Sequence, residues 1–249
     1  MDIPIKTPEE IELMRKGGVI LLKVLDEMAK AVRPGISTYE LDRLAESIIR
    51  DHEGASPGFK GYRGFPATLC TSINEEVVHG IPSRHRILND GDIIGVDSGV
   101  LYGGFYTDAC RTFMVGNVAP EVVRFVNVTK QALDNAIDQI KPGGHIGDIS
   151  AAIQKTLEKH RYSPVVECTG HGVGRALHEP PEIFNIGRKN TGPAMKPGMV
   201  LAIEPISTMG AGKVITADDR WTIISADRSL SAHFEHTVLV TDDGYEILV

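Results

Sequence analysis

The chain carries the same order of helix and strand signals twice. Each half has two predicted helices separated by a basic residue, a proline and a glycine, at 33–35 and at 141–143. Proline lacks a backbone donor and glycine adopts the positive φ at which many helices end, so both triplets are helix breaks. The two breaks are 108 residues apart. The predicted helices span about residues 7–32, 37–52, 120–140 and 147–160.

A predicted strand after each helix pair strengthens this repeat. The apolar run 91–97 aligns with the run 198–204 at an offset of 107 residues, and each run ends in an acid. His79 and His178 align at an offset of 99 residues. We therefore predict an internal duplication, roughly 7–115 and 120–249, with halves related by a pseudo-twofold axis. Because the halves share a core, residues 1–249 are expected to form one domain of the α+β class, with helices packed on a curved antiparallel sheet.

Four acidic residues lie in or beside apolar, strand-like runs, where acids are rare. They are Asp97, Asp108, Glu204 and Glu235. A carboxylate taken out of water costs several kcal/mol unless a positive group meets it. Four such acids, with His171 in a Gly-His-Gly turn, require more positive charge than one arginine supplies. A pair of metal ions satisfies that requirement best.

Asp97 and Asp108 flank a predicted hairpin turn at 101–104. If 102–103 is the two-residue loop, Asp97 lies directly opposite Asp108, and if 103–104 is the loop, the two are diagonal. Side chains alternate along a strand, so both registers put the two acids on one face of the sheet. The alternative interpretation is an aspartate paired with Arg111 or with turn amides.

Glu204 and Glu235 are 31 residues apart, against 11 for the first pair of acids. The repeat therefore requires an insertion in the second half, at 207–231, which carries Trp221. Alternation puts His233 on the same face as Glu235 and His236 on the other face. At most one of the two histidines can therefore face the site, and for both we expect ordinary hydrogen bonding or surface exposure. The stretches 60–75 and 182–197 are expected to be loops that frame a cleft.

One imidazole and four carboxylates form an oxygen-rich ligand set. Such a set favours Mn²⁺, Fe²⁺ or Co²⁺ over a thiolate-type zinc site, although zinc also accepts nitrogen and oxygen ligands. Two divalent ions about 3.5–4 Å apart, bridged by carboxylates, lower the pKa of a water held between them and polarise a carbonyl group. The pattern therefore predicts a hydrolase.

Several longer motifs occur in order along both halves of the chain. They lie at 61–66, 70–75, 79–82, 170–174, 204–205, 227–232 and 235–237. On these motifs the chain resembles the type I methionine aminopeptidases over essentially its whole length. The resemblance implies the pita-bread fold and a cytoplasmic metalloprotease. The implied reaction removes the N-terminal (initiator) methionine from nascent proteins and peptides, with preference for a small second residue.

The resemblance also implies roles for individual residues. The implied ligands of two divalent metal ions are Asp97, Asp108, His171, Glu204 and Glu235, and Glu204 is also expected to move a proton for the attacking water. His79 and His178 are expected to act on the scissile amide. The residues implied to receive the methionine side chain are Tyr62, Phe65, Cys70, Leu177 and Trp221. Asn74 and Ser231 correspond to a monovalent-cation site.

The sequence departs from common versions of that family at a few positions. Phe59, Phe65 and Leu177 stand at pocket-side positions, and Thr-Asp-Ala-Cys replaces a more familiar run at 107–110. An apolar slot suited to an unbranched thioether survives these changes. Cys110 is two residues from Asp108 and is interpreted as a small buried apolar residue. A further hypothesis is that oxidation or alkylation of Cys110 weakens metal binding.

Bulk properties narrow the classes of partner. A chain of 249 residues with 42% hydrophobic residues and a net charge of −7 is typical of a globular protein without affinity for nucleic acid. Basic clusters at 84–86 and 188–189 are interpreted as solvated loops. No apolar run reaches the ~18–20 residues of a membrane span, and no signal-peptide pattern is expected at the N-terminus. Three cysteines without a Cys-x-x-Cys pair indicate a reducing cytoplasm. We expect a monomer whose partners are N-terminal methionine peptides and nascent chains, with transient ribosome contact.

Two other functions compete with this interpretation. One is a proline-specific aminopeptidase or dipeptidase of the same fold, which usually has an additional N-terminal domain. The other is a binding protein that kept the scaffold and lost catalysis. All five ligand positions and both active-site histidines are present, which favours an enzyme.

Overall fold

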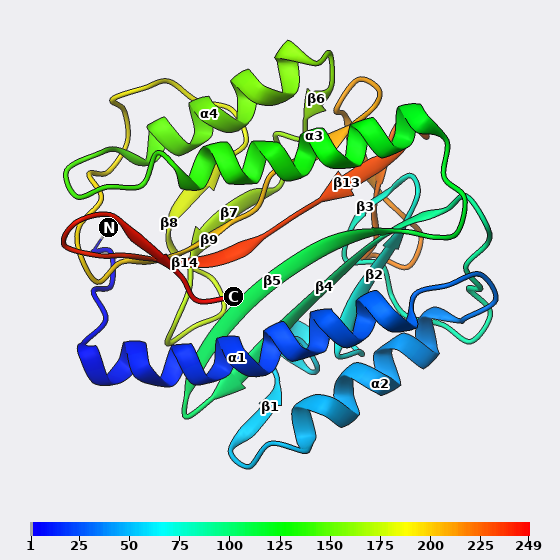
Figure 1. Cartoon of the computed structure of the whole chain (residues 1–249), viewed down its shortest axis with the longest axis horizontal. Helices are drawn as coiled ribbons and strands as arrows, with labels where there is room; N and C mark the ends of the chain where they lie inside the picture. The colour runs from blue at the N-terminus through cyan, green and yellow to red at the C-terminus, as the bar shows by residue number, and fades with distance from the viewer. Residues whose placement is uncertain (1) are drawn as a thin grey trace.

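A computed structural model describes residues 2–249. Within these residues four α-helices form two pairs, and in Figure 1 one pair lies along each edge of the molecule with strands between them. The helices are α1 (Pro8–Ala31), α2 (Thr38–Arg50), α3 (Pro120–Ile137) and α4 (Ile146–Lys159). All four predicted helices are confirmed, and their ends differ from the predicted ones by at most three residues.

Capping boxes start the first two helices. The Thr7 hydroxyl accepts a hydrogen bond from the backbone N–H of Glu10, and the Glu10 carboxylate accepts one from the backbone N–H of Thr7 at 2.8 Å. Ser37 and Glu40 make the same reciprocal pair at the start of α2. Each box gives partners to backbone groups that the helix itself leaves unbonded. The start of α1 is therefore held in a defined position.

The strands form four antiparallel sheets. The first has β1 (Ala55–Pro57), β2 (Leu69–Ile73), β4 (Ile93–Tyr102) and β5 (Phe105–Met114), and the second has β7 (Thr169–Gly172), β8 (Glu179–Phe184), β9 (Val200–Ile203), β14 (His236–Val240) and β15 (Tyr245–Ile247). A third contains β6 (Ser163–Pro164), β10 (Ile206–Thr208) and β13 (Ser231–His233), and a fourth contains β3 (Glu76–Val78), β11 (Val214–Thr216) and β12 (Ile223–Ser225). The molecule is thus of the α+β class. That its halves share an origin, and that residues 1–249 form one domain, stay predictions.

The hairpin of β4 and β5 has the second of the two registers considered above. Tyr102 pairs with Phe105, so Gly103 and Gly104 form the loop, both at positive φ. Asp97 then pairs with Cys110, and Asp108 pairs with Gly99. Asp97 and Asp108 are therefore diagonal neighbours on one face of the sheet.

The two large sheets meet where β5 runs beside the segment between β13 and β14. The backbone N–H of Glu235 donates to the Cys110 carbonyl at 2.9 Å. The Thr237 hydroxyl accepts from the Asp108 backbone N–H at 2.9 Å and donates to the Asp108 carbonyl at 2.7 Å. We call this contact of β5 with residues 233–237 the seam. It brings Asp108 and Glu235, which are far apart in the sequence, next to each other.

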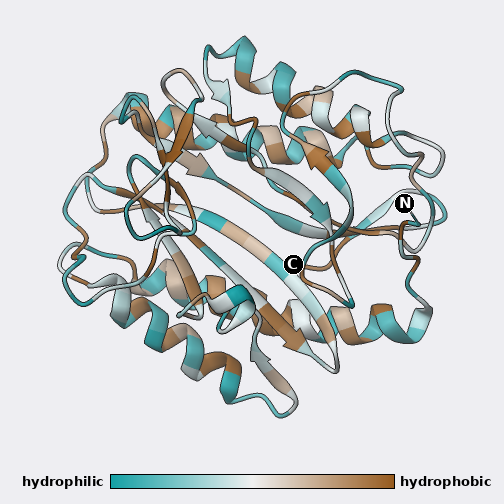
Figure 2. Cartoon of the chain, turned by 180° about the vertical axis from the view of Figure 1, so that it is seen from behind, coloured by the Kyte–Doolittle hydropathy of each residue, from teal (hydrophilic) through white to brown (hydrophobic). Residues whose placement is uncertain are grey.

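The core lies between the helices and the sheets. Phe125 of α3, Leu21 of α1 and Leu41 of α2 are fully buried, and each such side chain contributes about 1.5–3 kcal/mol by leaving water. Figure 2 shows brown apolar segments along the strands and alternating brown and teal on the helices. Gly18 is required in α1 because a Cβ there would overlap the carbonyl oxygen of Leu248. The first helix therefore packs directly on the C-terminal backbone.

Two expectations about connecting segments need correction. Residues 60–75 are not all loop, because they include a 3₁₀ turn (Tyr62–Gly64) and strand β2. The stretch 182–197 is not all loop either, because its first three residues belong to β8. Within residues 2–249 it contributes no side chain to the cavity lined by Asp97 and His171, and it passes over α4, where the Gly147 N–H donates to the Thr191 carbonyl. The expected insertion 207–231 contains β11 and β12 and ends in β13.

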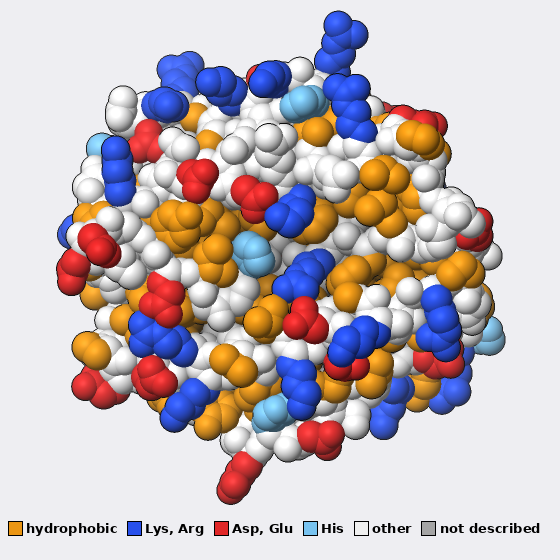
Figure 3. Space-filling view, viewed as in Figure 1, with side chains coloured by type: hydrophobic (Ala, Val, Ile, Leu, Met, Phe, Trp, Pro, Cys, Tyr) orange, Lys and Arg blue, Asp and Glu red, His pale blue; other side chains and the backbone are white. Residues whose placement is uncertain are grey.

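The surface carries both signs of charge. In Figure 3 Lys and Arg side chains and Asp and Glu side chains are interspersed over the face shown, with apolar patches between them. Among the helices of residues 2–249, none has both the length and the apolar character that crossing a bilayer requires.

Candidate metal centre

Four carboxylates and one imidazole meet at the bottom of a cavity. Asp97, Asp108, His171, Glu204 and Glu235 all line it. His171 Nε2 lies 3.7 Å from Glu204 Oε1 and 4.0 Å from Asp108 Oδ2. Ligand atoms of Asp108, His171 and Glu235 fall within 4.8 Å of one another. The structure thus brings together all five residues that the sequence pointed to.

Strand ends and registers position these side chains. Asp97 belongs to β4 and Asp108 to β5, while Glu204 directly follows β9 and Glu235 directly precedes β14. The last pair between β9 and β14 is Ile203 with His236, so the next residues outward on the two strands are Glu204 and Glu235. The two glutamates thus leave the sheet side by side and face the two aspartates across the seam.

His171 is oriented by its own strand. Its Nδ1 lies 2.8 Å from the carbonyl oxygen of Gly172, which fixes the proton on Nδ1 and leaves Nε2 as an acceptor. Gly170 and Gly172 lack side chains because a Cβ at either would strike backbone atoms of the neighbouring strands. The Gly-His-Gly sequence therefore allows β7 to lie close to β8 and β9 while its imidazole points at the acids.

The carboxylates hold their protons strongly because they are crowded and buried. Burial raises the pKa of Asp97 and the pKa of Glu204 to about 7. Burial, with the charges of Asp97 and Glu204, raises the pKa of Asp108 well above its usual range. Burial and the other three acids do the same to the pKa of Glu235. Four carboxylates in these positions require a positive partner to be ionised near neutral pH.

Unpartnered atoms show that protein groups do not supply that partner. Asp97 Oδ1, Asp108 Oδ1 and Glu235 Oε1 are buried and accept no hydrogen bond within residues 2–249. Arg111, the alternative partner considered from the sequence, pairs instead with Asp26 at 2.9 Å. Buried polar atoms are normally bonded, so these three oxygens fit cation ligands. The donor set, carboxylates with imidazole, fits divalent metal ions.

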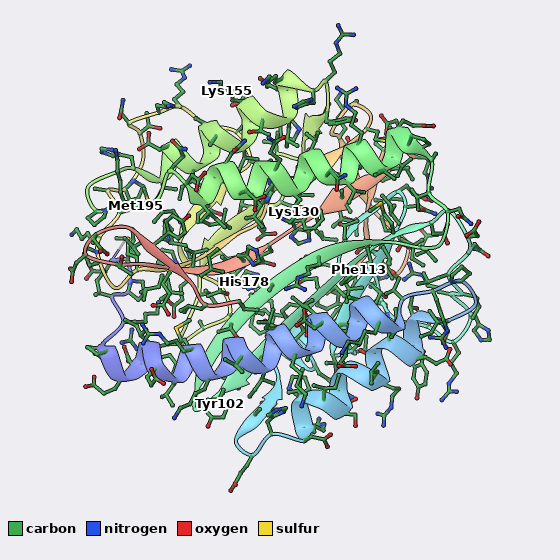
Figure 4. The ribbon with its side chains drawn as sticks, viewed as in Figure 1. Tyr102, Phe113, Lys130, Lys155, His178 and Met195 are labelled. Carbon is green, nitrogen blue, oxygen red and sulfur yellow. The ribbon has the colours of Figure 1, made fainter. Side chains whose placement is uncertain are left out.

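Two further histidines stand over the cluster. His178 lies near the centre of Figure 4, between the two helix pairs, and its Nδ1 is 3.1 Å from the Tyr62 hydroxyl. The His178 ring also lies against the His171 ring, with 4.3 Å between the centroids. Both side chains are exposed where they line the cavity. Partial desolvation by the cavity wall lowers the pKa of His79 to about 4, helped by the charge of His233, and the same effect with the nearby His171 lowers the pKa of His178 to about 3. Both imidazoles are therefore neutral at pH 7.

The cavity wall on one side is apolar. Phe65, Cys70, Leu177 and Trp221 line it, with Tyr62 at the rim. Phe65 and Trp221 meet edge to face with 5.2 Å between their centroids. The cavity volume is about 160 Å³, much more than the ~15 Å³ that one water occupies on this measure. An apolar slot thus opens directly beside the carboxylate cluster.

Comparison with known proteins decides the family. The model of metallopeptidase family M24 matches residues 12–242. Methionine aminopeptidase of Clostridium acetobutylicum is 47% identical over 99% of this chain and 98% of its own length. Methionine aminopeptidase of Escherichia coli is 43% identical over 100% of this chain and 94% of its own length. This chain belongs to metallopeptidase family M24.

Solved structures show that the fold is the pita-bread fold of this family. The crystal structure of methionine aminopeptidase from Thermotoga maritima matches with a TM-score of 0.98 and 43% identity, and covers 99% of both chains. Prolidase from Pyrococcus furiosus matches with a TM-score of 0.80 at 24% identity, and this chain covers 64% of it. The second likeness shows a common fold alone. M24 membership therefore rests on the full-length relatives.

His233 is a site residue of this M24 protein that the sequence reasoning missed. It was expected to be hydrogen-bonded or exposed, but it is 4% exposed, lines the cavity and points Nε2 toward Glu204. His236 follows the expectation, because its Nδ1 lies 2.7 Å from the Val249 carbonyl oxygen, away from the site. Strand alternation correctly places His233 on the same face as Glu235, but it does not give the distance between His233 and the other acids.

Cys110 and Asn74 are close to the site without lining its cavity. The Cys110 thiol is 1% exposed and lies 3.6 Å from the His233 carbonyl oxygen, behind the acids. Burial and the charge of Asp97 raise the pKa of this thiol, which makes it unreactive. Asn74 has positive φ, and its carbonyl accepts from the Ser231 N–H at 2.8 Å. The structure thus joins Asn74 and Ser231 directly.

Proposed function

We propose that this chain is a metal-dependent aminopeptidase that removes methionine from the N-terminus of peptides and nascent proteins. The carrying observation is a buried cluster of four carboxylates and His171 on the floor of a cavity with an apolar wall. The full-length relatives named methionine aminopeptidase support the same assignment. The side chain of an N-terminal methionine residue is enough to explain the apolar slot beside the cluster.

Two divalent ions are proposed to be held by Asp97, Asp108, His171, Glu204 and Glu235. Ions bound there lower the pKa of a water molecule and polarise the scissile carbonyl group. The unpartnered oxygens of Asp97, Asp108 and Glu235 support this ligand set. Mn²⁺, Fe²⁺ and Co²⁺ suit its oxygen-rich chemistry best, and Zn²⁺ is also a candidate.

Glu204 is proposed to move the proton. Its side chain is 12% exposed and lines the cavity, so its carboxylate is within reach of a water molecule held there. Glu204 takes a proton from the attacking water and passes it to the departing amine. Replacing Glu204 by a residue that cannot ionise should therefore slow the reaction more than it weakens substrate binding.

His79 and His178 are proposed to bind the scissile amide. With the Tyr62 hydroxyl donating to Nδ1 of His178, the His178 proton lies on Nε2 and is free to donate to a substrate carbonyl oxygen. Because both imidazoles are neutral, they donate hydrogen bonds without adding charge to a site designed for cations. This arrangement stabilises the negative charge that develops on the carbonyl oxygen during attack.

The apolar wall is proposed to select methionine. Phe65, Cys70, Leu177 and Trp221 form a narrow slot that suits an unbranched, polarisable thioether better than a branched or charged side chain. Preference for a small second residue is proposed as well. A monovalent cation near Asn74 and Ser231, a cytoplasmic location, a monomeric state and transient ribosome contact stay predictions of the sequence.

Peptide hydrolysis tests this function. Met-Ala-Ser should lose its first residue, a dipeptide ending in proline should not be cleaved, and a chelator should abolish turnover until Mn²⁺ or Co²⁺ is restored. Cleavage of the proline dipeptide in preference to Met-Ala-Ser would favour the proline-specific alternative. An absence of turnover with any divalent metal would favour a binding protein.

A further inference from the structure

His233 places a second imidazole against the carboxylate cluster. Its Nε2 lies 3.4 Å from Glu204 Oε2 and 3.9 Å from Glu235 Oε2. The ring is 4% exposed and lines the same cavity as the five proposed ligands. His171 Nε2 is nearest to Glu204 Oε1, and His233 Nε2 is nearest to Oε2 of the same carboxylate. The two imidazoles thus flank one carboxylate.

The ring nitrogen Nε2 of His233 is buried and makes no hydrogen bond within residues 2–249. The backbone of His233, by contrast, is fixed on both sides, because its N–H donates to the Thr112 hydroxyl at 2.9 Å and its carbonyl accepts from the same hydroxyl at 2.8 Å. A buried, rigidly held and unpartnered imidazole nitrogen aimed at carboxylates requires an explanation.

The distances between His233 Nε2 and the neighbouring carboxylate oxygens supply an explanation. Two atoms that bind the same ion at about 2.1 Å lie roughly 3.0 Å apart at right angles and roughly 3.4 Å apart at the tetrahedral angle. The separation of His233 Nε2 from Glu204 Oε2, 3.4 Å, has the tetrahedral value, and its separation from Glu235 Oε2 is 3.9 Å. The corresponding separations of His171 Nε2, 3.7 and 4.0 Å, are slightly longer. By spacing and burial, His233 is as well placed as His171.

We propose that His233 is a second imidazole ligand of the dinuclear metal site. This inference rests on the proposed metal-dependent function and extends it, because the ligand set becomes four carboxylates and two imidazoles. A second nitrogen donor shifts the preference of the site from Mn²⁺ toward Fe²⁺, Co²⁺ and Zn²⁺. The competing arrangement is a neutral His233 that donates Nε2–H to Glu204 without touching metal.

Cadmium NMR separates the two arrangements without relying on activity. The whole protein, grown with ring-¹⁵N-labelled histidine, is stripped with chelator and loaded with two equivalents of ¹¹³Cd²⁺. Each imidazole ligand splits the ¹¹³Cd signal through one ¹¹³Cd–¹⁵N coupling. We expect two couplings in the unmodified protein, one of which disappears in His233→Gln. Cd²⁺ affinity should fall by about tenfold or more in that variant.

His236→Gln is the matched control, because His236 lies on the same segment with its ring against the C-terminal backbone. It should keep both couplings and its Cd²⁺ affinity. A single coupling in the unmodified protein, retained in His233→Gln and lost in His171→Gln, overturns the proposal while leaving the metal site intact. Failure of the unmodified protein to bind Cd²⁺ overturns both the proposal and the metal-dependent function. Counting couplings in the unmodified protein decides the question even if a variant folds poorly.

Discussion

At the scale of single residues, the site is a set of carboxylates that are costly to keep ionised. Asp108 and Glu235 are 4% and 2% exposed, and each has an oxygen without a partner. Their mutual repulsion and burial disfavour the charged form, which is the form that binds metal. At these positions the negative charge that gives metal affinity also lowers the stability of the metal-free protein, and a bound cation offsets that cost.

Replacing one of these acids should remove metal affinity selectively. Glu235→Gln keeps the size of the side chain and removes the negative charge, so divalent-metal affinity should fall by about 100-fold or more. Glu182→Gln is the control, since Glu182 pairs with His171 across β7 and β8 but is exposed. Titration calorimetry with Mn²⁺ measures both. Equal losses in the two variants would contradict the assignment of Glu235.

Stability of the metal-free protein should fall as the pH rises. Burial raises the pKa of Asp97 and the pKa of Glu204 to about 7, against roughly 4 for an exposed carboxyl group. A carboxyl group with a raised folded-state pKa favours folding while it is protonated. That stability is fully present below about pH 4 and is lost as the pH rises through about 7.

Urea unfolding with chelator present should therefore give a free energy that is lower at pH 8 than at pH 5, by on the order of a few kcal/mol. The double variant Asp97→Asn, Glu204→Gln should show a smaller difference between the two pH values, because only Asp108 and Glu235 of this cluster then contribute to it. The same difference in variant and parent would show that other groups cause it.

At the scale of elements, the loop between β7 and β8 is fastened to the start of the chain. Lys6 Nζ lies 2.5 Å from Glu179 Oε2, with side chains 1% and 6% exposed. Arg175 pairs with Glu10, the capping-box residue of α1, at 2.6 Å. The same loop carries Leu177 and His178 into the cavity. The N-terminal segment thus positions one wall of the site.

Lys6→Met should loosen that wall. It leaves the Glu179 carboxylate buried without its cation, which costs about 3–5 kcal/mol of unfolding free energy. The KM for Met-Ala-Ser should rise while Mn²⁺ affinity is unchanged, because His178 and Leu177 move and the metal ligands do not. Urea unfolding and steady-state kinetics measure the two effects.

Arg175→Gln is the comparison for Lys6→Met, since Arg175 is about half exposed and its surface pair contributes less than about 1 kcal/mol. Adding Glu179→Gln to Lys6→Met should restore most of the lost stability. If Lys6→Met and Arg175→Gln lower the unfolding free energy equally, burial of the Lys6–Glu179 pair does not determine its contribution to stability.

At the scale of the whole molecule, the site exists only at the seam between the two large sheets. Asp97 and Asp108 come from one sheet, and Glu204, Glu235 and His171 come from the other. Thr237 fastens the seam, because its buried hydroxyl bonds both the N–H and the carbonyl of Asp108. Packing of the two large sheets and formation of the site are therefore one event.

Thr237→Val should weaken the seam. Valine has the same shape but leaves two buried backbone groups without partners, at about 1–3 kcal/mol each. Unfolding free energy should fall by roughly 2–6 kcal/mol, and metal affinity should fall with it because Asp108 loses its anchor. Thr241→Val, at a partly exposed threonine whose hydroxyl donates to Asp243, should change neither quantity. A stability loss without a loss of metal affinity would separate the seam from the site.

Local signals made much of the molecule predictable. The capping boxes at Thr7 and Ser37 and the two Pro-Gly breaks set the helix ends to within three residues, because they act over a single turn. Four of the five proposed ligands stand out because acids in apolar strands are rare, and His171 stands out by its Gly-His-Gly turn, while the family resemblance implies their roles as ligands. His233 was not predicted to be in the site, since its sequence shows which face it occupies but not how far that face lies from Glu204.

The sequence by itself determined the helices, the two-half arrangement of signals, the single face shared by Asp97 and Asp108, and the need for a cation. These follow from periodicity and from the cost of burying charge, which are local properties. Only the tertiary structure decided the diagonal hairpin register, the convergence of Glu204 with Glu235, the slot formed by Phe65 and Trp221, and the place of His233. Those depend on which strands lie side by side across the seam, and packing of distant segments settles that.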